Sequence, residues 1–377
     1  MPRLLARDGW VTMRPIAHVA PMHHQTTGPD RAMQALRSIA AALIAASTAF
    51  LPQEAAAQGA QPGPTLSAVR SKGLLDCGAN QGSPGFGVPD SRGEQRGLDP
   101  DICRAIAAAV LGDASRVRWT VLTSQARIPA LQSGQVDVVA RTFTWTHSRE
   151  VNAGLQFGPV TFYDGQGFIV RRSTGVTRAA QLEGATICVS AGSTNELNLA
   201  DWARSNNIRV QPLVFESNED TRKAYTAGRC DAYTLDASQL AAFRTSLVRE
   251  DHIILPDIIS KEPLTPAVRK GDPQWYDIMR WTVHALILAE ELGITQANVD
   301  EMLQSQNPDI RRLLGVTGDH GPAMGLDRRW AYNAIKAVGN YGEIFERHLG
   351  AGSAIGLDRG LNNLWNRGGL MYAPPIR

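Results

Sequence analysis

Net charge, metal-binding motifs and phosphate-binding motifs are scarce or missing in this sequence. The 377 residues carry 38 Lys and Arg against 36 Asp and Glu, so the formal net charge is only +2. With no dense basic block, the chain lacks the electrostatic signature of a nucleic-acid-binding protein. No Cys-x-x-Cys pair or neighbouring histidine cluster supports a zinc site. The glycine-rich loop 79–87 lacks the Lys-Ser/Thr ending of a phosphate loop. We therefore expect neither a metal nor another cofactor.

Long hydrophobic runs are also rare, and the clearest one lies near the beginning of the chain. Arg37 leads into an apolar, Ala-rich run over residues 38–51, and Ala55-Ala56-Ala57 follows. A charged start, a hydrophobic middle and a small-x-small site are the parts of a secretory signal peptide. The run is shorter than the about 20 residues that a membrane span needs, and a buried core helix is the alternative. We predict a signal peptide over residues 1–57, cleaved after Ala57; the pattern also fits a translation start at Met33.

Four cysteines remain in the predicted mature chain, residues 58–377, which is long enough for two domains with separate cores. They fit an oxidising compartment and allow three disulfide connectivities. Nearest-neighbour pairing, Cys77 with Cys103 and Cys188 with Cys230, keeps each bridge inside one half of the chain.

Strand-like and helix-like segments alternate along the mature chain. The sequence predicts strands over residues 74–78, 117–122, 136–140, 186–189, 210–215 and 230–236. It predicts helices over residues 66–72, 100–110, 128–133, 195–205, 218–227 and 237–245. This alternation indicates α/β architecture with parallel strands, whose ligands bind beyond the carboxyl ends of the strands.

Polar side chains follow three of these predicted strands. Thr142 and Thr144 come after the strand 136–140 and, with Thr146, would line one face of an extended chain. Arg149 follows them, and its planar guanidinium suits a carboxylate because it can donate two parallel hydrogen bonds. The alternative for Arg149 is a helix cap or a surface ion pair.

In the second half of the chain, polar residues again stand at the ends of predicted strands. Ser193 and Thr194 lie on a Gly-Ser-Thr turn before a helix, where unpaired N–H groups favour an anion. Asp236 ends a strand, and it is either the N-cap of the helix 237–245 or the partner of a cationic amine. The glycines of the loop 79–87 would let backbone N–H groups approach a ligand.

Ordered motifs give the chain from Leu66 to Arg377 a specific resemblance. They include Gly97-Leu98-Asp99, Ala130-Leu131-Gln132-Ser133-Gly134 with Asp137, Thr144-Trp145-Thr146-His147-Ser148-Arg149, Tyr163-Asp164-Gly165-Gln166-Gly167-Phe168, Ala227-Gly228-Arg229-Cys230-Asp231, Glu262-Pro263-Leu264, Asn340-Tyr341-Gly342 and Gly368-Gly369-Leu370-Met371-Tyr372-Ala373-Pro374-Pro375. In these motifs the chain resembles the periplasmic substrate-binding proteins of ABC-type amino-acid importers, above all the branch for general L-amino acid uptake.

The resemblance implies a two-lobed type II periplasmic-binding fold, in which each lobe is a mostly parallel sheet flanked by helices and the ligand cleft lies between the lobes. Lobe 1 would comprise residues 66–165 and 264–377, with an extended helical C-terminal region, and lobe 2 would comprise residues 166–263. Residues 58–65 would be a linker. The segment 293–330 looks inserted relative to smaller relatives, and we expect it to decorate lobe 1.

The resemblance also implies ligand contacts. Arg149 would clamp the α-carboxylate, and Asp236 would take the α-ammonium group. Further contacts would come from Thr142, Thr144, Ser193, Thr194, Asn80 and Ser83. Two departures stand out: small residues replace a large aromatic near Ser83, which implies a roomier side-chain pocket, and Phe143 stands where a polar residue is expected. Arg127 and Arg141 could also reach the cleft, although we expect a structural role beside the site for each.

The expected protein is thus a monomeric periplasmic receptor that binds L-amino acids of broad side-chain class. Its further partner would be the inner-membrane permease of an ABC importer. The main alternative is an exported dehydratase-like enzyme on the same fold, in which His147 would be a general base. A sensory module is a second alternative, and it would be expected to continue into a membrane span and a signalling domain.

Overall fold

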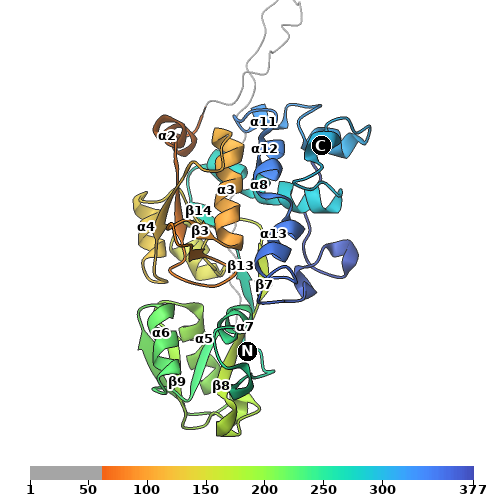
Figure 1. Ribbon diagram of the computed structural model, residues 1–377. Coiled ribbons are helices and arrows are strands. Elements are labelled where there is room, and N and C mark those ends of the chain that lie inside the picture. Colours follow the sequence, from red (N-terminus) through yellow and green to blue (C-terminus); the bar gives the residue numbers. More distant parts are fainter. Residues whose placement is uncertain (1–61) are drawn as a thin grey trace, which may run out of the picture. The chain divides into compact units, whose positions relative to one another are not determined.

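Two five-stranded sheets organise the residues that the computed structural model describes, 62–377 (Figure 1). The predicted signal peptide and the first four residues of the predicted linker, 58–61, lie outside the described residues. Within residues 62–377, no helix is both long enough and apolar enough to cross a membrane.

The first sheet has the strand order β4-β1-β5-β14-β6. Its strands are β1 (Leu75–Ala79), β4 (Val117–Val121), β5 (Val138–Val139), β6 (Leu155–Phe157) and β14 (Ala267–Arg269). β1 pairs in parallel with β4 and β5, whereas β14 pairs antiparallel with β5 and β6. Strands from two distant parts of the chain therefore complete one sheet.

The second sheet has the order β10-β9-β11-β8-β12. Its strands are β8 (Gln166–Arg171), β9 (Thr186–Ser190), β10 (Gln211–Phe215), β11 (Ala232–Asp236) and β12 (His252–Ile254). β9 is parallel to β10 and β11, and β8 is antiparallel to β11 and β12.

Each sheet is mixed, so the expectation of mostly parallel sheets was too strong. Two of the four pairings in each sheet are antiparallel. The antiparallel strands β8 and β14 directly follow the segments that carry the chain from one sheet to the other. Those segments include β7 (Phe162–Asp164) and β13 (Glu262–Leu264), which pair antiparallel with each other. Each connection enters the next sheet from the end that faces the other sheet. The strand that it leads into, β8 or β14, therefore runs antiparallel to its two neighbours in that sheet.

Helices flank the sheets and build most of the core of the first lobe. Their bounds are α2 (Pro64–Lys72), α3 (Leu98–Leu111), α4 (Arg127–Ser133), α5 (Thr194–Ser205), α6 (Asn218–Thr226), α7 (Ala237–Arg244), α8 (Pro273–Glu291), α9 (Val299–Met302), α10 (Pro308–Leu313), α11 (His320–Ala323), α12 (Trp330–Val338) and α13 (Tyr341–His348). A short hairpin joins β2 (Val88–Pro89) to β3 (Gln95–Arg96). Figure 1 shows α3 beside α12 and α8, and buried apolar side chains of all three belong to one core cluster.

The segment 293–330 contains α9, α10 and α11. Its side chains Val299, Ile310 and Leu313 are buried in the same core cluster as α3 and α8. The segment is therefore packed into the core around the first sheet.

Both disulfides that nearest-neighbour pairing predicts are present. Cys77 on β1 is bonded to Cys103 on α3, and Cys188 on β9 is bonded to Cys230 just before β11. Each bridge ties elements of one sheet and its flanking helix or loop together, so neither crosses between the two sheets.

One local prediction is wrong. The strand expected over residues 136–140 is shorter in the structure, Val138–Val139, and Thr142 has a φ of 37°, in the left-handed region. The chain is therefore not extended from Thr142 to Thr146, and the three threonines do not form one face. Thr146 instead accepts a hydrogen bond from the backbone N–H of Arg149 through its hydroxyl oxygen (3.3 Å).

Candidate functional site

A small polar cavity lies where the carboxyl ends of β5, β9 and β11 meet. It measures about 20 Å³ and is lined by residues from the loops, helices and strand ends around both sheets: Ser124, Arg127, Arg141, Thr142, Thr144, Ser193, Thr194, Asn195, Asn218, Leu235, Asp236 and Gln239. This position matches the rule that ligands of α/β sheets bind beyond the carboxyl ends of the strands.

Thr142 shapes the side of the cavity that belongs to the first sheet. Its backbone N–H donates to Oδ2 of the buried Asp99 (2.7 Å), and its hydroxyl oxygen accepts from Nδ2 of Asn80 (3.4 Å). Burial raises the pKa of Asp99 to about 7, although the Thr142 N–H and the charge of Arg141 oppose the shift. The backbone turn at Thr142 is thus held by a carboxyl group from the start of α3.

Three buried arginines, Arg127, Arg141 and Arg149, belong to this region, and two of them contact the ring of Phe143. The guanidinium carbons of Arg127 and Arg149 lie 4.2 and 5.0 Å from the ring centroid. Arg149 donates from Nη1 to the carbonyl oxygen of Thr144 (2.8 Å), and Arg141 donates from Nε to that of Leu122 (2.6 Å). Within residues 62–377, none of these arginines forms an ion pair with a carboxylate.

Burial also lowers the pKa of each of these three guanidinium groups. It lowers the pKa of Arg149 and of Arg141 to about 10 each. Burial and the neighbouring charges of Arg149 and Arg141 lower the pKa of Arg127 well below its ordinary value. The side of the cavity that belongs to the first sheet is therefore strongly cationic and poorly solvated.

Asp236 provides a carboxyl group from the end of β11, across the cavity from the arginines. Its Oδ1 accepts from Nδ2 of Asn195 (2.9 Å), and its Oδ2 accepts from Nε2 of Gln239 (2.8 Å). Burial, together with the nearby carboxyl groups of Asp164 and Glu262, raises its pKa well above the ordinary value. A cation placed against Asp236 would reverse this shift by stabilising the carboxylate.

Ser193 and Thr194 line the cavity at the start of α5. Ser193 is the N-cap: its hydroxyl oxygen accepts from the N–H of Glu196 (3.2 Å), while its O–H donates to the carbonyl oxygen of Ser190 (2.6 Å). The hydroxyl of Thr194 lies 3.2 Å from that of Thr144 on the other side of the cavity. It also donates to Oε2 of Glu262 (2.8 Å).

The structure places some, but not all, of the eight predicted ligand-binding residues in the lining of the cavity. Five line the cavity: Thr142, Thr144, Ser193, Thr194 and Asp236. The other three, Arg149, Asn80 and Ser83, lie around it rather than in its lining. Asn80 contacts Thr142, and Ser83 donates to Oε1 of Gln239 (2.9 Å).

Several lining residues were not among the predicted ligand contacts. Arg127 and Arg141, expected to support the site, line the cavity directly. Gln239 lies three residues after Asp236 on the helix that Asp236 begins, a spacing that points both side chains the same way. That spacing could have identified Gln239, whereas nothing in the local sequence marks Ser124 or Asn218.

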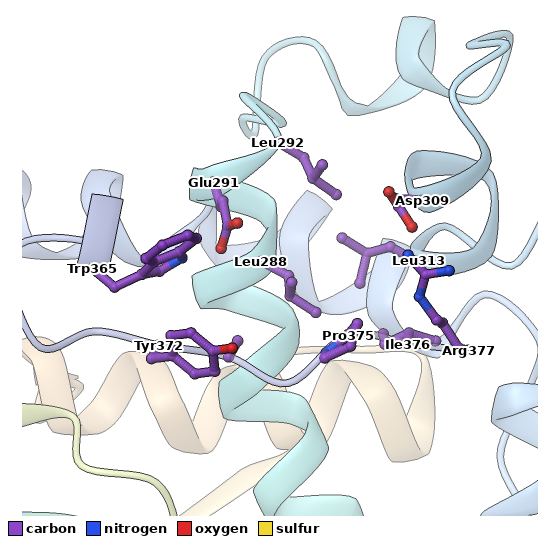
Figure 2. Close-up of a pocket in the computed structure, with 11 residues that line it drawn as sticks. Leu288, Glu291, Leu292, Asp309, Leu313, Trp365, Tyr372, Pro375, Ile376 and Arg377 are labelled. Carbon is purple, nitrogen blue, oxygen red and sulfur yellow. The ribbon is translucent and has the colours of Figure 1, made fainter. Parts of the chain in front are cut away.

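Two other features do not join this site. His147, the possible general base of the enzyme alternative, is exposed and is not among the lining residues. A roomier pocket of about 210 Å³ is shown in Figure 2, where residues of α8 lie between Trp365 and Tyr372 on one side and residues of α10 with Arg377 on the other. It contains none of the residues predicted to bind ligand.

Chemically, the cavity places buried cations on one side and a hydrogen-bonded carboxyl group on the other. A zwitterion fits such an arrangement, because burying its two charges is costly unless each meets an opposite charge.

Comparison with known proteins gives one consistent family. The family model described as bacterial extracellular solute-binding proteins, family 3, matches residues 75–296, more than half of the chain. The chain is 55% identical over 316 residues to the general L-amino acid-binding periplasmic protein AapJ of Rhizobium johnstonii, covering 83% of this chain and 93% of the relative. It is 52% identical over 321 residues to the glutamate/glutamine/aspartate/asparagine-binding protein BztA of Rhodobacter capsulatus, covering 85% and 95%.

A solved structure agrees with these relatives. The periplasmic binding protein of an ABC transporter from Brucella ovis, with glutathione bound, superposes with a TM-score of 0.81 at 52% identity. The match covers 84% of this chain and 100% of that chain.

Proposed function

The chain belongs to family 3 of the bacterial extracellular solute-binding proteins, and we propose that it binds L-amino acids in the cavity between its two sheets and delivers them to an ABC importer. The relatives named above support this proposal, since they are binding proteins for amino acids. The dehydratase alternative finds no support among them.

The observation that carries the proposal is the opposition of charge across the cavity. The α-carboxylate of the ligand would bind Arg149, with the hydroxyl groups of Thr142, Thr144, Ser193 and Thr194 filling the remaining hydrogen-bonding positions. The α-ammonium group would bind Asp236, whose carboxyl group already holds two hydrogen bonds. Asn80 and Ser83 would cover the ligand side chain.

Binding requires the two lobes to move. A cavity of about 20 Å³ holds little more than one water molecule, so an amino acid can enter only when the lobes separate. We place the lobe boundaries near Gln166 and Pro263, with residues 66–165 and 264–377 in one lobe and 166–263 in the other. A ligand that touches both sides favours the closed state, because only there are both of its charges paired.

The proposal extends to location and partners. The predicted signal peptide over residues 1–57 would export the chain to the periplasm, the compartment that the name of the relative AapJ gives. There the protein would act as a monomer and meet the permease of its importer when closed.

Calorimetric titration of the ligand-free protein tests this function. We expect saturable binding of acidic, amide, aliphatic, basic and aromatic L-amino acids in a panel, with differing affinities. Arg149→Ala should weaken every one of them by at least about 100-fold, because it leaves the α-carboxylate buried without its partner. The exposed Arg204 offers a matched control, and Arg204→Ala should bind as the wild type does.

Two outcomes would count against the proposal. If no L-amino acid binds the wild-type protein, the ligand class is wrong. If Arg149→Ala binds amino acids normally while remaining folded, the carboxylate lies elsewhere in the cavity.

A further inference from the structure

A second cavity, the one drawn in Figure 2, lies between α8, α10 and the segment 365–377. Its volume is about 210 Å³, below the about 300 Å³ at which pockets for drug-sized ligands begin, so an occupant has to be small. Leu288 and Leu292 of α8 and Leu313 of α10 belong to its lining. These aliphatic side chains offer a surface on which an alkyl chain can pack.

Two aromatic side chains, Trp365 and Tyr372, also line this cavity, and we call them the aromatic wall. Their ring centroids lie 5.6 Å apart at an interplanar angle of 62°, and the two residues are 50% and 60% exposed. The backbone N–H of Trp365 donates to the carbonyl oxygen of Met371 (3.0 Å), which holds Trp365 beside the next residue of the chain, Tyr372. Because the faces of aromatic rings are electron-rich, such a pair attracts an ammonium group.

Glu291 of α8 is the acidic side chain of this lining that has no cation. The other one, Asp309, is paired with Arg312. Within residues 62–377, no group donates a hydrogen bond or forms an ion pair with the carboxylate of Glu291. Figure 2 shows Glu291 on the side of α8 that faces the aromatic wall, whereas Arg377 lies on the side of α10. An unpaired carboxylate next to two aromatic rings is an arrangement that suits an ammonium ion.

We propose that this cavity is a second binding site, for a small primary amine that carries an alkyl chain and no carboxylate. The ammonium group donates to Glu291 and lies against the aromatic wall, and the alkyl chain covers the leucines of α8 and α10. A carboxylate on the carbon atom that bears the ammonium group would lie beside Glu291, where the two like charges repel each other. The cavity therefore takes a different class of ligand from the proposed amino-acid site, where Arg149 requires a carboxylate.

The indole N–H resonance of Trp365 in a heteronuclear NMR spectrum reports on this cavity directly, and Trp365→Phe assigns it. In the wild type we expect n-butylammonium to shift this resonance saturably. n-Butanol has the same chain without the charge, and it should bind at least about 10-fold more weakly because it loses the charged hydrogen bond. L-Norvaline is the same amine with a carboxylate added, and its effect on the resonance should be weaker by a similar factor.

Two variants and a control test the assigned roles. Glu291→Gln should weaken n-butylammonium binding by at least about 10-fold, because the ammonium group loses its charged partner. Tyr372→Leu keeps an apolar side chain but removes one ring, and it should weaken binding by about 2- to 5-fold, the effect of an exposed cation–π contact. Glu301→Gln removes an exposed carboxylate outside the cavity and should bind n-butylammonium as the wild type does. None of the three side chains is buried, so the variants should fold, and their unfolding temperatures check this.

Three results would overturn the proposal: no saturable shift with n-butylammonium, equal binding of n-butanol, or unchanged binding by Glu291→Gln. The peptide acetyl-Gly-Lys-Gly-amide carries the same alkylammonium group on a protein-like chain. If this peptide shifts the Trp365 resonance and n-butylammonium does not, the cavity receives a lysine side chain of a protein partner, and the assignment to a small amine is wrong.

Discussion

Thr142 shows how one residue sets the shape of the site. A φ of 37° is unfavourable for a residue that carries a β-branched side chain, at a cost of roughly 1–2 kcal/mol. The hydrogen bond from its N–H to Asp99 holds this conformation and turns the backbone toward the cavity. From the sequence, a shared face for Thr142, Thr144 and Thr146 depended on an extended chain, and the local sequence could not show the turn because Asp99 lies 43 positions away from Thr142.

The buried carboxyl group of Asp99 makes stability depend on pH. Its folded pKa of about 7 lies above the ordinary value of 3.8, so the folded protein holds a proton that the unfolded chain has released between those values. The contribution to the free energy of unfolding is therefore fully present below the unfolded pKa and is lost as the pH rises through the folded pKa. Between about pH 5 and about pH 8, Asp99 should account for a loss of roughly 2 kcal/mol.

Urea unfolding of wild type and Asp99→Asn at both pH values measures this loss. The amide oxygen of the variant can still accept from the Thr142 N–H but does not titrate, so the variant should lose less stability than the wild type across the range. The remaining titratable groups are common to both proteins and cancel in the comparison. Equal losses in the two proteins would show that Asp99 is ionised throughout.

At the scale of single elements, α3 begins and ends with glycines that serve different purposes. Gly97, before the helix, has a φ of 142°, and a Cβ there would lie 2.4 Å from the backbone carbon and oxygen of Phe86. Gly112, after the helix, has a φ of 72° and no atom within 4 Å of such a Cβ. The first glycine permits a close backbone approach, whereas the second only ends the helix.

Alanine substitutions at these two glycines should therefore differ in cost. Gly112→Ala should lower the free energy of unfolding by roughly 1 kcal/mol, the cost of a left-handed alanine. Gly97→Ala should cost more than about 3 kcal/mol, because the backbone of the loop 85–87 must move. Gly97→Ala should also weaken ligand binding. The loop accepts hydrogen bonds from the N–H groups of Leu98 and Asp99 at the start of α3, and the side chain of Asp99 holds Thr142 at the cavity. Urea unfolding of both variants checks the order, and equal costs would mean that the loop yields easily.

The elements also show which parts of the structure the sequence could predict. Helices α2, α4 and α6 end within two residues of their predicted ends, because a glycine follows each of them closely. The antiparallel entry of β8 and β14 was not predicted, since strand patterns do not reveal direction. Arg127 was expected to have a structural role beside the site, because the local sequence does not show where its side chain points. Its place in the lining of the cavity, against the ring of Phe143, became visible only from the structure.

At the scale of the whole molecule, contacts outside the proposed ligand contacts help to hold the two lobes together. Arg222 on α6 donates from Nη1 to the carbonyl oxygen of Gly82 (2.6 Å), in the glycine-rich loop of the other lobe. We call this contact the latch. Arg222 does not line the cavity, so the latch contributes to the closed state without touching the ligand. In a two-state protein, such a contact changes the affinity for every ligand through the population of the closed form.

Removing the latch with Arg222→Ala should weaken all ligands by one common factor. A hydrogen bond of this kind is worth about 0.5–1.5 kcal/mol, which corresponds to about 2- to 10-fold in Kd. The ratio of glutamate to leucine affinity should stay at its wild-type value, because Arg222 does not line the cavity. Lys223→Ala, on the neighbouring exposed residue of the same helix, is the control and should change neither quantity. Small-angle scattering of the ligand-free proteins measures the open population, which should rise only in Arg222→Ala. A change in the affinity ratio would mean that Arg222 acts on the ligand side chain, and affinity and selectivity would then not be separable in this molecule.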